Sequence, residues 1–228
     1  MDIFEGYIYP LTERYQKQRN TAYAQAMSQY MRNQFEFFGI KHPQRRILDK
    51  QFIREYGLPT KVNLETILPE LWQQTERELQ YFAIDLAASC NYYRQESSLD
   101  LIEKMIIQRS WWDTVDAVSS GLVAPYFRYF PEKMHTIAYQ WIASENTWLQ
   151  RVAITFQRKY KKLTDQELLF DLIRLRADSK EFFIQKGIGW ALREYAYTNP
   201  EVVRDFVSVQ CMSNLSKREA LKHIGGNC

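Results

Sequence analysis

Glycine, proline and cysteine are scarce in this chain of 228 residues, which has 8, 7 and 3 of them. With hydrophobic residues at 46%, this composition argues against a disordered chain and for a globular protein with a sizeable core. The cysteines, Cys90, Cys211 and Cys228, are far apart and show no metal-ligand spacing. We therefore expect reduced thiols and no metal site.

Long apolar runs and cofactor motifs are also absent. No stretch approaches the roughly 18 apolar residues of a membrane span, and residues 1–5 lack the features of a signal peptide. There is no Walker loop, dinucleotide fingerprint or zinc motif, so we expect no metal and no organic cofactor. The sequence predicts a soluble, cytoplasmic protein without membrane contact, and nothing in it requires more than a monomer.

A strong excess of one charge is missing as well, because the formal net charge is only +3. Net charge alone therefore does not indicate a nucleic-acid partner. The distribution is more informative, since residues 158–162 form a dense basic run, Arg-Lys-Tyr-Lys-Lys. A solvated helix face explains such a run equally well.

Helix signals, in contrast, are abundant, and strand-like alternation is rare. Apolar residues recur at helical spacing, as in Ile102, Met105 and Ile106. Asn199 before Pro200 is typical of a helix start. Three segments fit the capping box that begins many helices: 164–167, 178–181 and 216–219.

One interval recurs along the chain. Arg46, Tyr81, Asp116, Arg151 and Lys186 are each 35 residues apart (81−46, 116−81, 151−116, 186−151). Such a period predicts an all-α fold, a HEAT-like helical repeat solenoid of antiparallel helix pairs stacked into a curved array. We expect one domain over 1–228, with N-terminal cap helices in 1–60, repeats in 61–199, and a C-terminal cap and tail in 200–228. Equivalent positions of neighbouring repeats should then line one groove.

The candidate site residues lie at these positions. On a helix, Trp112 and Asp116 would stand one turn apart on one face, with Arg151 on the next repeat. Trp190 follows one helical turn after Lys186, the last of the residues spaced by 35. Gly187 and Gly189 remove side chains where something approaches the backbone closely.

A carboxylate between aromatic rings favours a cation. Two unit charges about 4 Å apart attract by roughly 4 kcal/mol at an effective dielectric near 20, or about three powers of ten in rate if the attraction arises in the transition state. An N-alkylated purine nucleotide fits this site, because its base is cationic and its sugar becomes oxocarbenium-like as the glycosidic bond breaks. Arg151 could hold a flanking phosphate.

At these residues the chain resembles the bacterial AlkD-type HEAT-like alkylpurine DNA glycosylases. The likeness runs over nearly the whole chain. It is carried by five segments: 30–35 (YMRNQF), 110–116 (SWWDTVD), 151–154 (RVAI), 181–195 (EFFIQKGIGWALREY) and 215–224 (LSKREALKHI).

The resemblance implies hydrolytic removal of 3-methyladenine and 7-methylguanine from double-stranded DNA, with the DNA in a concave groove and the lesion not flipped into a pocket. It makes Asp116 the catalytic acid residue, with Trp112 and Trp190 as aromatic walls. Arg151 and Tyr30 become DNA contacts. We expect Lys159, Lys186 and Arg193 to hold phosphates as well.

Structural explanations of the same residues remain open. Helical tryptophans are usually packing residues, and Asp116 and Arg151 could merely join neighbouring repeats. Asp113 could be a structural acid. A second function also stays possible: a non-catalytic HEAT-repeat module that binds DNA structure or a protein partner. The discriminating observation is whether the basic residues point into one groove.

Overall fold

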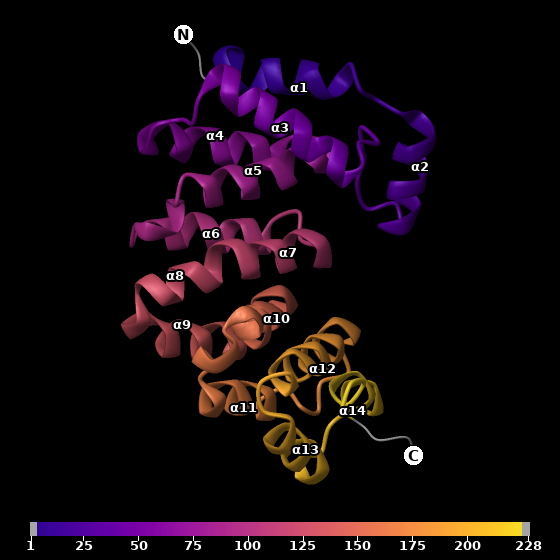
Figure 1. The fold of residues 1–228 in the computed structure, drawn as a ribbon, viewed down its shortest axis with the longest axis vertical. Coiled ribbons are helices and arrows are strands. Elements are labelled where there is room, and N and C mark those ends of the chain that lie inside the picture. Colours follow the sequence, from indigo (N-terminus) through magenta and orange to yellow (C-terminus); the bar gives the residue numbers. More distant parts are fainter. Residues whose placement is uncertain (1–3, 225–228) are drawn as a thin grey trace. The chain divides into compact units, whose positions relative to one another are not determined.

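The computed structural model describes residues 4–224; Cys228 and the flexible tail expected from Gly225 lie outside this range. Within it the chain is helical throughout (Figure 1). The strand-type pairing of the described residues is a single bridge between Glu36 and Glu76. The predicted fold class, an all-α helical repeat, is confirmed.

The chain divides into two compact units, residues 1–92 and 93–228. The first unit comprises a π-helical turn η1 (Phe4–Ile8) and the α-helices α1 (Tyr9–Gln16), α2 (Thr21–Tyr30), α3 (His42–Tyr56), α4 (Lys61–Gln73) and α5 (Arg77–Ser89). A short turn, η2 (Tyr92–Arg94), runs from the first unit into the second.

The second unit carries the remaining helices. They are α6 (Ser98–Ile107), α7 (Trp112–Val118), η3 (Ser119–Val123), α8 (Ala124–Tyr129), α9 (Pro131–Ala143), α10 (Thr147–Thr155), η4 (Phe156–Lys159), η5 (Lys161–Leu163), α11 (Gln166–Arg174), α12 (Phe182–Ala196), α13 (Pro200–Val209) and α14 (Asn214–Ala220). The division into caps at 1–60 and 200–228 around repeats at 61–199 stays a prediction.

The helices pack because their apolar stripes are buried as the spacing predicts. Ile102, Met105 and Ile106 of α6 are buried, and so are Leu168 and Leu172 of α11. Burying each such side chain contributes roughly 1.5–3 kcal/mol. Among the described residues, no helix is long and apolar enough to cross a membrane.

The repeat interval reappears as contacts in the second unit. The side chains of Ser119 and Thr155 are hydrogen bonded across 36 residues, and the Tyr160 hydroxyl donates to the Ala124 carbonyl across the same separation. The period read from the sequence therefore corresponds to one step from a helix to its neighbour in the stack.

The predicted helix starts are only partly correct. α11 is capped by Asp165, whose side chain accepts from the Leu168 N–H, one residue later than the capping box implies. The boxes at 178–181 and 216–219 are wrong, because α12 begins after Glu181 and α14 is capped by Ser213. Pro200 does occupy the first turn of α13, although Asn199 makes no side-chain cap there.

Candidate active site

Three helices of the second unit carry the predicted site residues. α10 contacts both α7 and α12, so the three lie side by side (Figure 1). α10 begins sharply because the Asn146 side chain accepts from the N–H groups of Trp148 and Leu149. This cap fixes the start of α10 and thereby the position from which the Arg151 side chain, one turn further on, projects.

Asp116 and Arg151 form a bidentate ion pair between α7 and α10. The Arg151 Nε donates to Asp116 Oδ1 at 2.9 Å, and a terminal nitrogen donates to Oδ2 at 2.8 Å. The other terminal nitrogen donates to the Phe183 carbonyl of α12 at 2.5 Å. The Arg151 side chain is 5% exposed and that of Asp116 is 11% exposed, so both residues are buried and only a small part of Asp116 reaches solvent.

Arg151 and Asp116 therefore join neighbouring helices, which is one of the two uses of Arg151 that the sequence left open. Its guanidinium is engaged by an acid and a carbonyl within the protein, and it is not turned outward. The interval of 35 residues corresponds to this contact between the acid and the base. The phosphate contact expected of Arg151 stays a prediction.

Trp190 of α12 meets a residue that the sequence did not single out. The Arg158 guanidinium of η4 lies over the Trp190 ring, 3.4 Å from its centroid. Burial lowers the pKa of Arg158, and the nearby Asp116 carboxylate opposes that shift. Arg158 makes no ion pair with any described residue. Its Nε donates to the Thr155 carbonyl at 3.2 Å, and its guanidinium lies on the indole face.

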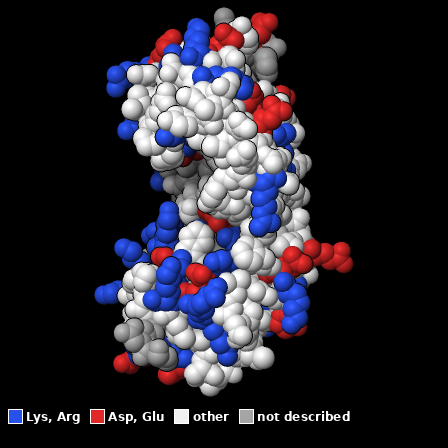
Figure 2. Space-filling model, turned by 90° about the vertical axis from the view of Figure 1, so that its right-hand side faces the viewer, with Lys and Arg blue, Asp and Glu red and all other residues white. Residues whose placement is uncertain are grey.

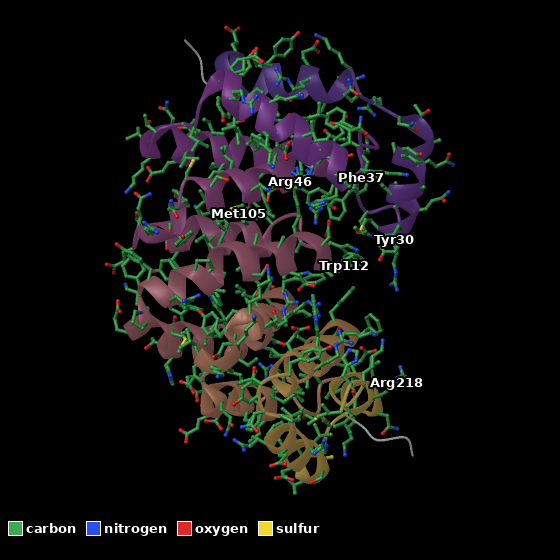
Figure 3. The ribbon with its side chains drawn as sticks, viewed as in Figure 1. Tyr30, Phe37, Arg46, Met105, Trp112 and Arg218 are labelled. Atoms are coloured by element: carbon green, nitrogen blue, oxygen red, sulfur yellow. The ribbon has the colours of Figure 1, made fainter. Side chains whose placement is uncertain are left out.

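Trp112 is the first residue of α7, where it is half-buried (Figure 3). Its neighbour Trp111 belongs to an aromatic cluster. The Trp111 ring centroid lies 5.9 Å from that of Trp148 and 5.1 Å from that of Phe183. Trp111 and Trp148 therefore serve packing, the usual role of helical tryptophans.

Lys186 and Arg193 of α12 share one acid on α14. The Lys186 Nζ lies 2.8 Å from Glu219 Oε1, and an Arg193 nitrogen lies 3.0 Å from Oε2. Both cations remain partly exposed. The hydrogen bond from Lys186 is the main reason why the pKa of Glu219 is lowered. Glu219, like Arg158, was not picked out from the sequence.

The two glycines of α12 are explained by close neighbours. A Cβ on Gly187 would lie 3.3 Å from an Arg151 nitrogen, and one on Gly189 would lie 2.5 Å from the Glu219 Cβ. The prediction that something approaches the backbone here is confirmed. Gly187 leaves room for the buried arginine, and Gly189 lets α14 pack against α12.

The remaining predicted residues lie elsewhere. Lys159 is exposed, directly after Arg158. Tyr30 ends α2 in the first unit and is 71% exposed (Figure 3). In the part of Figure 2 that shows the second unit, Lys and Arg side chains gather on the face turned to the viewer.

The arrangement is suited to acting on a cation. A carboxylate has about four acceptor sites, and Arg151 occupies two of those on Asp116. The free sites are available to a water or a developing positive charge at the exposed edge. Exposed cations on η4 and α12 could hold the phosphates of a strand.

Comparison with known proteins gives a consistent result. The sequence model of a family described as "DNA alkylation repair enzyme" matches residues 11–224. A predicted DNA alkylation repair enzyme from Enterococcus faecalis is 36% identical, with 92% of this chain and 98% of that chain covered and a TM-score of 0.84. The comparison with curated proteins gave no match.

Two structures from Streptococcus mutans share the fold at lower identity. AlkD2 is 16% identical, with 88% of this chain and 100% of that chain covered and a TM-score of 0.65. The protein smu.31 from strain UA159 is 14% identical, with 79% and 98% covered and a TM-score of 0.61. At these identities the likeness shows the fold alone.

Proposed function

Because the chain belongs to the DNA alkylation repair enzyme family, we propose that it is a monofunctional DNA glycosylase. Its substrates are cationic N3- and N7-alkylated purines, such as 3-methyladenine and 7-methylguanine, in duplex DNA. The observation that carries this proposal is the Asp116 carboxylate, held by both of its oxygens on Arg151 with 11% of the side chain exposed.

The proposed reaction is a hydrolysis. The bond between the sugar C1′ and the purine nitrogen breaks, and its electron pair neutralises the positive charge of the base. A water oxygen bonds to C1′ and its proton passes to solvent. Asp116 stabilises the positive charge that develops on the sugar and positions the water, as in glycoside hydrolysis.

Arg151 is a positioning residue in this proposal. Its guanidinium fork fixes the plane of the Asp116 carboxylate through two parallel hydrogen bonds. Two of the acceptor sites of Asp116 are thereby used, and the others are directed to substrate.

The indoles supply the second part of the site. Trp112 and Trp190 are proposed to contact the deoxyribose of the damaged nucleotide. The Arg158 guanidinium now covers the Trp190 ring, so it must move aside when a cationic nucleotide takes its place. Lys159, Lys186 and Arg193 are proposed to hold phosphates, and Tyr30 to add a DNA contact from the first unit.

A second candidate function is that of a non-catalytic HEAT-repeat module that binds DNA structure or a protein partner. It is favoured by one observation: both Asp116 oxygens already accept from Arg151, as in a purely structural ion pair. The two candidates differ in whether base is released.

The deciding experiment measures release of 7-methylguanine and 3-methyladenine from methylated duplex DNA. The wild type should release both, and Asp116→Asn should be slower by about 100- to 1,000-fold, the usual cost of losing a charge-stabilising group. DNA affinity should change little. Equal release by Asp116→Asn and wild type would rule out the mechanism, and no release by wild type would favour the binding module.

Asp116→Asn leaves the Arg151 charge buried, so folding needs a control. The double variant Asp116→Asn, Arg151→Met removes both charges, a change that buried pairs often tolerate. If this double variant is folded and also inactive, lost stability does not explain the loss of release.

A further inference from the structure

The second unit contains an open cleft of about 470 Å³ between η2, α8 and η4. Three cations line it: Arg94 from η2, Arg128 from α8 and Lys159 from η4. All three are exposed, and none makes an ion pair with a described residue. No acidic residue lines the cleft. Unpaired cations without a nearby acid indicate a binding place for an anion.

Tyrosine rings form the walls between these cations. The Arg94 guanidinium lies 5.9 Å from the ring centroids of both Tyr93 and Tyr129. Tyr129 is 53% exposed. Tyr160 is buried, and burial raises its pKa, so its hydroxyl stays neutral and donates to Ala124. Rings between cations suit a ligand that alternates charged and flat or apolar groups, as a nucleic-acid strand does.

The cleft begins next to the candidate active site. Ser120 lines it and follows Asp116 by four residues on the continuous helix α7–η3, a rise of about 6 Å. Lys159 directly follows Arg158, which covers Trp190. Each DNA strand carries one phosphate per roughly 3.4 Å of helix axis. The cleft is therefore within a few nucleotides of Asp116.

We propose that this cleft is a strand subsite, in which Arg94, Arg128 and Lys159 hold the DNA backbone a few nucleotides from the damaged position. Its location relative to the lesion rests on the proposed glycosylase function. The subsite contributes affinity and takes no part in bond breaking. A free phosphate offers the same charge, but it would leave the tyrosine walls unused.

The test is the salt dependence of affinity for an undamaged duplex. The double variant Arg94→Gln, Arg128→Gln should bind about tenfold more weakly at low salt. The slope of log affinity against log salt should become less steep by about 1.8, since each phosphate contact contributes about 0.9. The matched control, Lys104→Gln with Lys133→Gln, removes the same charge from α6 and α9 and should leave the slope unchanged.

Two results would overturn the subsite. One is an equal slope in the cleft variant and its control. The other is competition by inorganic phosphate beyond that of chloride at the same ionic strength, which would mark the cleft as a site for free phosphate. On methylated DNA, the cleft variant should raise KM with kcat unchanged.

The two proposals can fail separately. A wild type that releases no base while the cleft variant still flattens the slope would defeat the glycosylase proposal and keep the cleft as a strand subsite. A wild type that releases base, with no change of slope in the cleft variant, would defeat the subsite alone.

Discussion

Each unit of this protein buries an arginine against an aspartate, yet the two sites are built differently. In the first unit, Arg45 pairs with Asp49 and Asp85 at 2.8 Å each. Arg46 also pairs with Asp85, and the Tyr15 hydroxyl donates to Asp49. Every charge in this network faces an opposite charge, so the network is complete without a ligand.

In the second unit, the Asp116–Arg151 pair has a cationic neighbour, Arg158, that forms no ion pair with a described residue. Arg158 is held on the face of Trp190, and no described acid pairs with it. Lys186 and Arg193 share the single acid Glu219. A buried ion pair is weak evidence of function by itself. The difference is that the second pair has beside it a cation, Arg158, which faces an aromatic ring instead of an acid.

The first way to test this comparison is to break the complete network. Asp49→Asn should lower the free energy of unfolding by about 3 kcal/mol, since it leaves part of the buried Arg45 charge unpaired. Urea unfolding measures the loss as a lower midpoint with an unchanged slope. Base release per folded molecule should stay at the wild-type rate. A fall comparable to that of Asp116→Asn would show that the two sites are not distinct.

Removing the unpaired cation tests the open site. Arg158→Gln uncovers the Trp190 face, which should then bind a substrate cation better by roughly 0.5–2 kcal/mol. The measurement compares affinities for duplexes with a cationic or a neutral abasic-sugar analogue. The ratio of the affinity for the cationic duplex to the affinity for the neutral duplex should rise by about twofold to thirtyfold.

Lys159→Gln is the control for this ratio, because it removes the adjacent charge without touching the indole. It should weaken binding to both duplexes alike. An unchanged or smaller ratio in Arg158→Gln would mean that Arg158 supports the indole and does not compete with the substrate.

The smallest effect is expected from Glu219, which holds two cations near the site. Its lowered pKa means that its contribution to stability is present above the unfolded value of about 4.3 and is lost as the pH falls through the folded value. Glu219→Gln should therefore be less stable than wild type at pH 7, with the difference vanishing at lower pH. Urea midpoints across that range measure it, and a difference independent of pH would contradict the assignment.

Much of the fold and part of the site follow from the sequence. The interval of 35 residues placed Asp116 beside Arg151, because a solenoid converts a sequence period into a spatial one. Gly187 and Gly189 also predicted close packing. Glycine destabilises the interior of a helix, so its presence there indicates that a neighbour needs the space.

The parts that could not be predicted depend on packing between helices. Arg158 reaches Trp190 only because α10 gives way to the tighter turn η4, a change that the helical period does not encode. The false capping box at Ser216 has a similar origin. Ser216 is buried inside α14, and its hydroxyl donates to the Gln185 carbonyl of α12. That contact explains the serine at this position, which does not mark a helix start.

Because Gly189 has no side chain, α14 packs closely against α12, the helix that carries Trp190. Glu219 of α14 can then pair with the positive charges of α12. Only because α14 lies so near can one carboxylate reach two cations that are almost two turns apart along α12. Any bulk introduced at Gly189 would push the acid outward and liberate both positive groups. The number of unpaired positive groups on α12 thus depends on a residue with no charge of its own.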